Sequence, residues 1–121
     1  MKKESRRSRR VADLVRAEIS NLLLIEANDP DLKGVTITEV EMPSDLQSAR
    51  VYFSALGGAP DRERAAHGLA RAAGYLRREV TRRCGLRYAP ELRFFADRSL
   101  EQGARVDKLL AEVLPPPDEE S

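Results

Sequence analysis

Apolar residues recur every three or four positions early in the chain, after a start that lacks such a pattern. The recurring set is Val11, Leu14, Val15, Ile19, Leu22 and Leu23. This spacing predicts one long amphipathic helix, which Ser5 or Ser8 can cap at its N-terminus. Pro30 and Gly34 follow at positions that end the helix in a turn.

A two-residue alternation replaces the helical period in the next segment and indicates a β-hairpin. Residues 35–42 are rich in β-branched side chains, and their alternation slips after Ile37, which predicts a strand with a bulge. A turn at 43–45 leads into 49–56, where apolar and polar residues alternate without a slip. Inward positions of this strand are Ala49, Val51, Phe53 and Ala55, and outward positions are Arg50, Tyr52 and Ser54.

Two helices are predicted between the hairpin and a third strand. Asp61 follows a cluster of glycines and can cap the first helix, whose packing side consists of small residues. Gly74 then interrupts the pattern, and a glycine inside a helix costs about 0.5–1 kcal/mol relative to alanine. Beyond it an apolar side recurs every four residues, formed by Leu76, Val80 and Cys84. The pattern therefore predicts that one helix ends at Gly74 and that a second follows.

The third strand is predicted over residues 91–97, where alternate residues from Leu92 onward face inward. Ser99 can then cap a last amphipathic helix that reaches Val113. The order αββααβα predicts an α+β fold. Its three-stranded mixed sheet combines the hairpin with a strand reached through a helical crossover, and the helices pack on one face.

Length and composition fit one globular domain. The chain has 121 residues, of which 41% are hydrophobic and 34% charged. We expect a folded domain over residues 8–113, between a flexible basic arm at 1–7 and a disordered acidic tail at 114–121. No apolar run exceeds four residues, so no membrane span is predicted. The single cysteine, Cys84, has no partner for an internal disulfide and fits a reducing cytoplasm.

The formal net charge of +1 hides a strong alternation of charge along the chain. Residues 1–16 carry seven basic and two acidic groups, whereas residues 17–63 carry three basic and nine acidic groups. Residues 64–87 carry seven basic groups and one acidic group, and residues 88–121 carry four basic and eight acidic groups. Two basic segments within one domain are typical of a protein that binds an anionic polymer.

Arginines of the two basic segments form the candidate site. One group lies around the helix expected after Gly74, and the other lies near the N-terminus. The two groups are Arg71, Arg77, Arg78 and Arg82, and Arg6, Arg7, Arg9 and Arg10. A helix that begins after a glycine would also offer free backbone N–H groups, which together with the helix dipole favour phosphate. We interpret the pattern as a surface that grips a nucleic-acid backbone. The alternative, in which the glycine only bends the chain and the arginines are solvated, stays open.

The sequence does not predict catalysis, a cofactor or a metal. A nucleophile needs an activating base, but the only histidine is His67, which has no partner at a matching spacing. Cys84 falls on the apolar side of its helix, as an inert core thiol does. A phosphate-binding loop of the form GxxxxGK(S/T) does not occur.

Two further binding modes are compatible with the sequence. Tyr52 and Phe95 point away from the expected core beside Arg50 and Arg93, where they could stack on bases or only cover part of the core. The acidic stretch at 17–63 could instead meet a basic protein. A generic RNA- or protein-interaction module is therefore the alternative to a more specific function.

Long stretches of the chain resemble the bacterial ribosome-binding factor A family. They are RRVADLVRAEI, VTITEVEMPSDLQSARVYFSALG, AAGYLRREV and LRYAPELRFFADRS, and they extend the resemblance over residues 5–113. The resemblance implies a type II KH-like fold with the order αββααβ, in which the RNA-binding GxxG loop is missing. An A-x-G kink between two helices takes its place, and Ala72, Ala73 and Gly74 match this kink.

The same resemblance implies a non-enzymatic role in ribosome assembly. Members of the family bind the small ribosomal subunit, contact its rRNA, and support late maturation and rRNA processing, notably during growth in the cold. The expected partners of this chain are therefore the small subunit and its rRNA, with a ribosome-associated GTPase as a further candidate. The protein is expected to be a cytoplasmic monomer.

Overall fold

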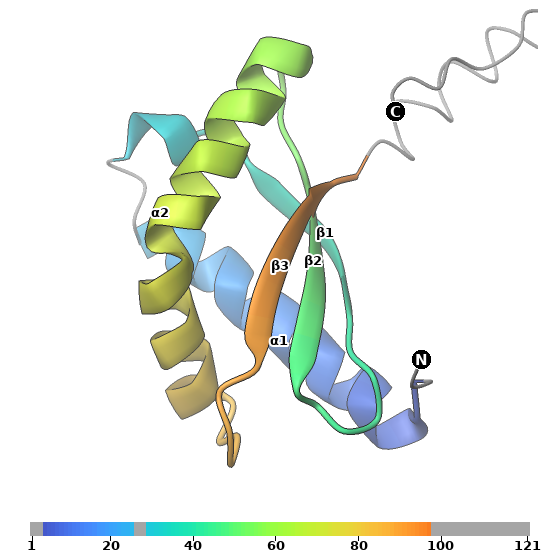
Figure 1. Cartoon of the computed structure of the whole chain (residues 1–121). Helices are drawn as coiled ribbons and strands as arrows, with labels where there is room; N and C mark the ends of the chain where they lie inside the picture. The colour runs from blue at the N-terminus through green and yellow to red at the C-terminus, as the bar shows by residue number, and fades with distance from the viewer. Residues whose placement is uncertain (1–3, 26–28, 98–121) are drawn as a thin grey trace, which may run out of the picture.

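Two long helices and a three-stranded sheet make up the part of the chain that the computed structural model describes, residues 4–25 and 29–97 (Figure 1). In chain order the elements are helix α1 (Arg6–Ile25), the short 3-10 helix η1 (Pro30–Leu32), strands β1 (Thr36–Glu41) and β2 (Ser48–Ser54), helix α2 (Ala59–Arg83) and strand β3 (Glu91–Ala96). The predicted α+β class is confirmed. The last helix and the acidic tail that the sequence predicts lie outside the described residues.

The sheet is mixed, as the sequence predicts. Its strands lie in the order β1-β2-β3, with β1 and β2 antiparallel and β2 and β3 parallel. The register of the hairpin shifts between Ile37 and Glu39, which confirms the bulge. The central strand β2 turns Ala49, Val51 and Phe53 into the core, where each is at most 1% exposed.

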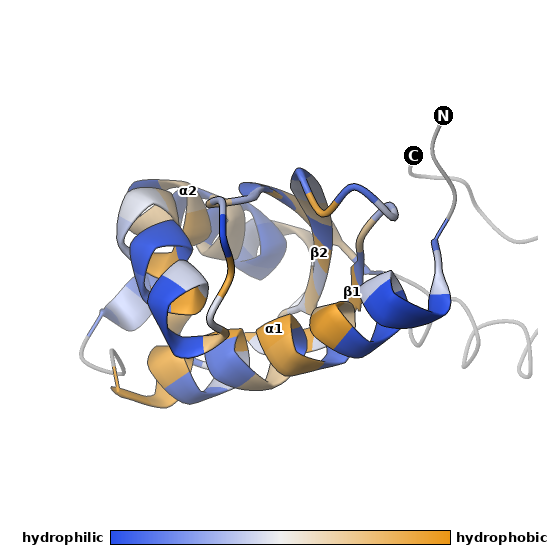
Figure 2. Ribbon diagram, turned by 90° about the horizontal axis from the view of Figure 1, so that it is seen from below, coloured by the Kyte–Doolittle hydropathy of each residue, from blue (hydrophilic) through white to orange (hydrophobic). Residues whose placement is uncertain are grey.

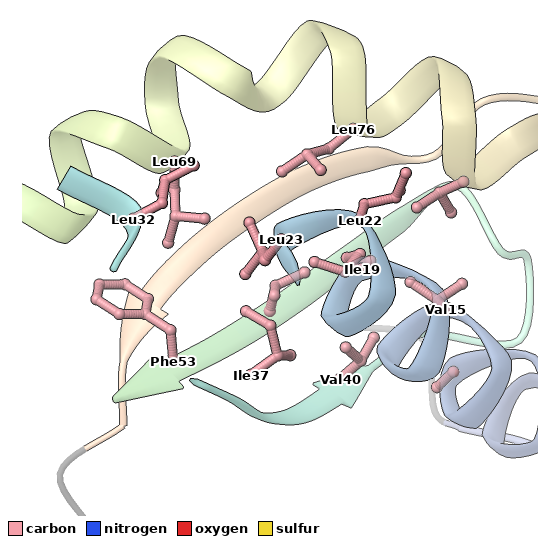
Figure 3. Close-up of a cluster of buried hydrophobic side chains, with 14 of the residues drawn as sticks. Val15, Ile19, Leu22, Leu23, Leu32, Ile37, Val40, Phe53, Leu69 and Leu76 are labelled. Atoms are coloured by element: carbon pink, nitrogen blue, oxygen red, sulfur yellow. The ribbon is translucent and has the colours of Figure 1, made fainter. Parts of the chain in front are cut away.

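The core lies between the sheet and the two long helices, which pack on one face of the sheet. In Figure 3, Ile37 and Phe53 project from the sheet, and Leu69 and Leu76 reach toward the core from α2. Apolar and polar segments recur along the ribbon of α1 (Figure 2), as expected for a helix with one side against a core. The buried residues of α1 are Ser8, Ala12, Val15, Ile19, Leu22 and Leu23.

Helix α1 starts at Arg6, so the last two residues of the arm predicted at 1–7 belong to the helix. Its cap is reciprocal. The Ser8 N–H donates to Ser5 Oγ at 3.0 Å, and the Ser5 N–H donates to Ser8 Oγ at 2.7 Å. This is a capping box with serine in place of the usual glutamate or glutamine. Both predicted serines therefore take part in the cap, and the two satisfied N–H groups explain why the helix begins this early.

Helix α2 runs without interruption through Gly74, so the prediction of two helices separated at this residue is wrong. The matching A-x-G stretch, residues 72–74, lies inside the helix. Packing on both sides of the glycine gives the physical reason. Leu69, Leu76 and Val80 are fully buried. Burial of one such side chain is worth about 1.5–3 kcal/mol, which exceeds the cost of about 0.5–1 kcal/mol for a helical glycine.

Asp61 does not cap α2, contrary to the prediction. The helix begins at Ala59, with Gly58 as its N-cap residue and no side-chain hydrogen bond to the cap. Asp61 therefore lies within the first turn, where it forms an ion pair with Arg64. Its negative charge still interacts favourably with the dipole at this end of the helix.

Gly68 marks a close approach between α2 and η1. A Cβ atom at this position would lie 3.0 Å from Leu32 Cδ2 and 3.0 Å from Asp31 Cβ, which is too close for an unadjusted contact. A Cβ atom at Gly74 would meet only Arg78 Nη1, at an ordinary contact distance of 3.7 Å. The glycine that the packing requires is therefore Gly68, whereas Gly74 lies on an open side of the helix.

Candidate nucleic-acid interface

The C-terminal half of α2 carries three of the predicted arginines, Arg77, Arg78 and Arg82, and all three are exposed. Arg77 Nη2 donates to the carbonyl oxygen of Ala89 at 2.9 Å, and Arg82 Nη2 donates to Glu79 Oε1 at 2.6 Å. The side chain of Arg78 forms no hydrogen bond or ion pair with any residue that the structure describes. Its guanidinium can therefore reach a ligand without breaking one of these contacts.

Arg83, which the helical pattern did not single out, belongs to the same cluster. Its Nε lies 3.3 Å from Glu79 Oε1, and its Nη1 lies 3.6 Å from Glu18 Oε1 on α1. Hydrogen bonds from Arg82 and then from Arg83 lower the pKa of Glu79, and the bond to Glu79 raises the pKa of Arg83. One carboxylate thus holds two guanidiniums at the C-terminal end of α2, where the helix dipole also favours cations. The i,i+4 spacing of glutamate and arginine was the available signal in the sequence.

Arg71 lies apart from this cluster and links α2 to η1 through ion pairs. Its Nη2 lies 2.9 Å from Asp31 Oδ2 and 3.3 Å from Asp29 Oδ2. The hydrogen bond to Asp31 is the largest cause of the raised pKa of Arg71. Because two carboxylates already surround this guanidinium, a contact between Arg71 and RNA would require these ion pairs to open.

The second predicted group occupies the first two turns of α1. Arg6, Arg7 and Arg10 are exposed and form no ion pair with a described residue. Arg9 Nε lies 3.6 Å from Glu4 Oε1. Positive charge at the start of a helix opposes the helix dipole, so helix stability does not explain these arginines. An anionic ligand would.

The two arginine groups are connected through the contact between the helices. The Arg83–Glu18 ion pair holds the end of α2 against the middle of α1. Glu18 follows Arg7 by eleven residues, which is close to three full turns, so both residues lie on the same side of α1, about 17 Å apart along its axis. Arginines from two helices thus face outward on the helical side of the described structure, as an interface with an extended polyanion requires.

Backbone N–H groups do not contribute to this surface in the way that the sequence predicts. Because α2 is continuous at Gly74, the N–H groups that follow the glycine bond within the helix and are not free to bind phosphate. Any phosphate contact in this part of α2 therefore falls to the side chains.

The two residues considered for catalysis are His67 and Cys84. His67 is exposed on α2, whereas Cys84 is half-buried, and burial raises the pKa of its thiol. The described residues contain no group of three or more His, Cys, Asp or Glu side chains that could hold a metal ion. Within the same part of the chain, none of the helices has the length and apolar character needed to cross a membrane.

Comparison with known proteins links this fold to one family. The model of the family described as ribosome-binding factor A matches residues 7–110. A relative from Syntrophobacter fumaroxidans, named ribosome-binding factor A, is 45% identical over 112 residues, which cover 91% of this chain and 96% of the relative. The family model therefore extends over every predicted arginine except Arg6 and over the whole described sheet.

Solved structures of the same name share the fold. The crystal structure of ribosome-binding factor A from Thermus thermophilus gives a TM-score of 0.65 at 24% identity, covering 74% of this chain and 94% of that one. A homology model of the Thermus thermophilus protein, fitted into the cryo-EM map of its 30S complex, gives a TM-score of 0.54 at 28% identity. That likeness covers 70% of this chain and 93% of the Thermus chain.

Proposed function

The chain belongs to the ribosome-binding factor A family, and on that basis we propose that it binds the small ribosomal subunit through small-subunit rRNA. The observation that carries the proposal is the likeness to the Thermus thermophilus protein fitted into a map of its 30S complex. We further propose a non-enzymatic role in the cytoplasm. The protein would support late maturation of the subunit and rRNA processing, with most effect during growth in the cold.

Arginines on the helical side supply the RNA contacts in this proposal. Arg78 and the start of α1, with Arg6, Arg7 and Arg10, offer guanidiniums that no described carboxylate neutralises. Such contacts bind the sugar–phosphate backbone and release counterions, so affinity should fall steeply as salt rises. Recognition would then depend on the folded shape of the rRNA more than on its base sequence.

Co-sedimentation of the purified protein with isolated small and large subunits, across a salt series, tests the proposal. We expect retention on the small subunit alone, with retention lost as salt rises. Equal retention on both subunits, or on neither, would contradict the small-subunit function. It would favour the alternative, a generic RNA- or protein-interaction module.

A matched pair of charge reversals tests the interface itself. The double variant Arg78→Glu/Arg82→Glu should weaken binding and reduce the slope of log K against log salt by about 1.5, because two phosphate contacts are lost. Arg64→Glu is the control, since this exposed arginine lies near the other end of the same helix. If the control weakens binding as much as the double variant, the C-terminal end of α2 is not the contact.

The maturation role needs a separate measurement in cells. A strain that lacks this protein should accumulate precursor small-subunit rRNA and should grow poorly at low temperature. Complementation by the parent chain, but not by the Arg78→Glu/Arg82→Glu variant, would connect the phenotype to the arginine surface. Normal rRNA processing in the deletion strain would refute the role even if the protein binds the subunit.

A further inference from the structure

The outer face of the sheet, opposite the helices, carries an aromatic pair, of which one ring is exposed and the other half-buried. Tyr52 of β2 and Phe95 of β3 are register partners, with ring centroids 5.7 Å apart and ring planes inclined by 34°. Phe95 is 42% exposed, whereas the inward-facing Phe53 is 1% exposed. The presence of an aromatic residue at position 95 is not explained by packing over the core, because the core lies on the other face of the sheet.

Charged residues surround this pair, and carboxylates outnumber guanidiniums. The set is Glu39, Glu41, Glu91 and Asp97 against Arg50 and Arg93, for a net charge of −2. Both guanidiniums have a carboxylate beside them. Arg50 Nη1 lies 3.6 Å from Glu41 Oε1. Arg93 Nη2 lies 3.2 Å from Glu91 Oε1. The outer face therefore repels a phosphate backbone, whereas the arginines of the helical side attract one.

Glu39 is the carboxylate best placed to meet a cation. It is exposed beside Tyr52, its register partner, and its side chain forms no hydrogen bond or ion pair with a described residue. The hydroxyl of Tyr52 donates to Glu41 Oε1 at 3.3 Å, which restrains the ring between Glu39 and Phe95. An aromatic platform with a carboxylate at its edge is thus formed before any ligand arrives.

An arginine side chain matches this combination of groups. Its planar guanidinium can stack on an aromatic ring while its N–H groups pair with a carboxylate, whereas lysine offers a compact charge without the planar group. We propose that the outer face of the sheet binds an arginine-bearing segment of a basic protein. In this interaction the guanidinium lies over the Tyr52–Phe95 pair and bonds to Glu39 beside Tyr52. The surface and the partner both differ from those of the proposed RNA contact.

Titration of the full, isotope-labelled chain with two peptides tests the proposal. The probes are capped decapeptides of arginine and of lysine, which carry equal charge. NMR shifts of the Thr38, Tyr52 and Phe95 amides report binding at this face. We expect the arginine peptide to bind more tightly than the lysine peptide. Phe95→Ala should lower the affinity for the arginine peptide by roughly two- to fivefold, which corresponds to the loss of an exposed cation–π contact.

Three variants distinguish binding at this face from binding elsewhere on the chain. Tyr88→Ala removes an aromatic side chain that is 72% exposed and lies outside the strands, and it should leave peptide affinity unchanged. Phe95→Leu keeps an apolar side chain without the ring and should lose the preference for arginine over lysine. Arg78→Glu should not weaken binding of the arginine peptide. A failure of the peptide proposal can therefore be distinguished from a failure of the proposed RNA contact.

Two results would overturn the proposal. One is equal affinity for the two peptides with no effect of Phe95→Ala, which would indicate only diffuse electrostatic attraction. The other is binding of single-stranded oligouridine, but not of the arginine peptide, at the same amides. That result would make the outer face a base-stacking surface.

Discussion

Replacing Gly68 by alanine is expected to destabilise the protein, because a Cβ atom there would lie 3.0 Å from both Leu32 Cδ2 and Asp31 Cβ. These neighbours cannot easily retreat. Leu32 is only 5% exposed, and Asp31 is held by Arg71 at 2.9 Å. Overpacking of this kind costs about 1–3 kcal/mol, and the better helix propensity of alanine returns about 0.5–1 kcal/mol. The expected net loss is about 1 kcal/mol, within a range of about 0–2.5 kcal/mol.

The same substitution at Gly74 should have the opposite sign. The new Cβ atom would meet only Arg78 Nη1 at 3.7 Å, and the residue lies inside a continuous helix. Only the propensity gain of about 0.5–1 kcal/mol then remains. Because 1 kcal/mol shifts the melting temperature of a domain of this size by about 4–8 °C, the two variants should melt several degrees apart, on opposite sides of the parent.

Circular dichroism during thermal and urea denaturation of the parent, Gly68→Ala and Gly74→Ala measures both effects. Destabilisation by Gly74→Ala would refute the reasoning, because it would show that Gly74 has a backbone conformation that alanine resists. The two-helix arrangement would then apply in solution. An unchanged or higher stability of Gly68→Ala would instead show that η1 does not approach α2 as closely as described.

Three smaller effects follow from the titratable groups. Glu79→Gln should lower the free energy of unfolding at pH 7, and by progressively less as the pH falls below the pKa of glutamate in the unfolded chain. Urea titrations of the parent and the variant across this pH range measure the difference. The pKa of Glu79 is depressed in the fold, so its contribution is present above the unfolded-state pKa and is lost as the pH falls through the folded-state value. At pH 8 the folded protein should react with a thiol reagent at Cys84 more slowly than a free cysteine does, because burial raises the pKa of this thiol. In urea the same residue should react at the rate of a free cysteine. Arg83→Ala should lower the melting temperature only slightly, because its ion pairs are exposed; a large loss would show that the link to Glu18 matters more.

Local signals in the sequence were sufficient for the strands and for the start of α1. Alternation placed Val51 and Phe53 inward, and the slip after Ile37 located the bulge, because a two-residue period translates directly into the faces of a strand. Ser5 and Ser8, at the start of α1, formed the expected cap, because capping involves atoms only three residues apart.

Gly74 shows where local reasoning fails. The propensity cost of glycine is real, but the buried leucines on both sides of it, Leu69 and Leu76, decide the outcome through contacts with the rest of the fold. Gly68 has the same local cost and is required by η1, which only the tertiary structure brings near it. A single sequence does not distinguish the two glycines.

The candidate interface was predictable in composition but not in its internal pairing. Exposure of Arg77, Arg78 and Arg82 followed from the helical period. The role of Arg71 did not, because its carboxylate partner Asp31 lies 40 residues earlier in the chain. Which arginines remain unpaired is a property of the fold, and it determines which of them can meet RNA without a competing contact.

The two strands that pair with β2 lie at different sequence separations from it. Thr36 pairs with Ser54, 18 residues later, whereas Ser48 pairs with Glu91, 43 residues later. Because loop closure costs more entropy for longer separations, the hairpin should form first and β3 should join after α2 has folded. Until then the edge of β2 that β3 will cover is unpaired and can pair with strands of other chains. Docking of β3 is therefore the folding step that removes this aggregation hazard.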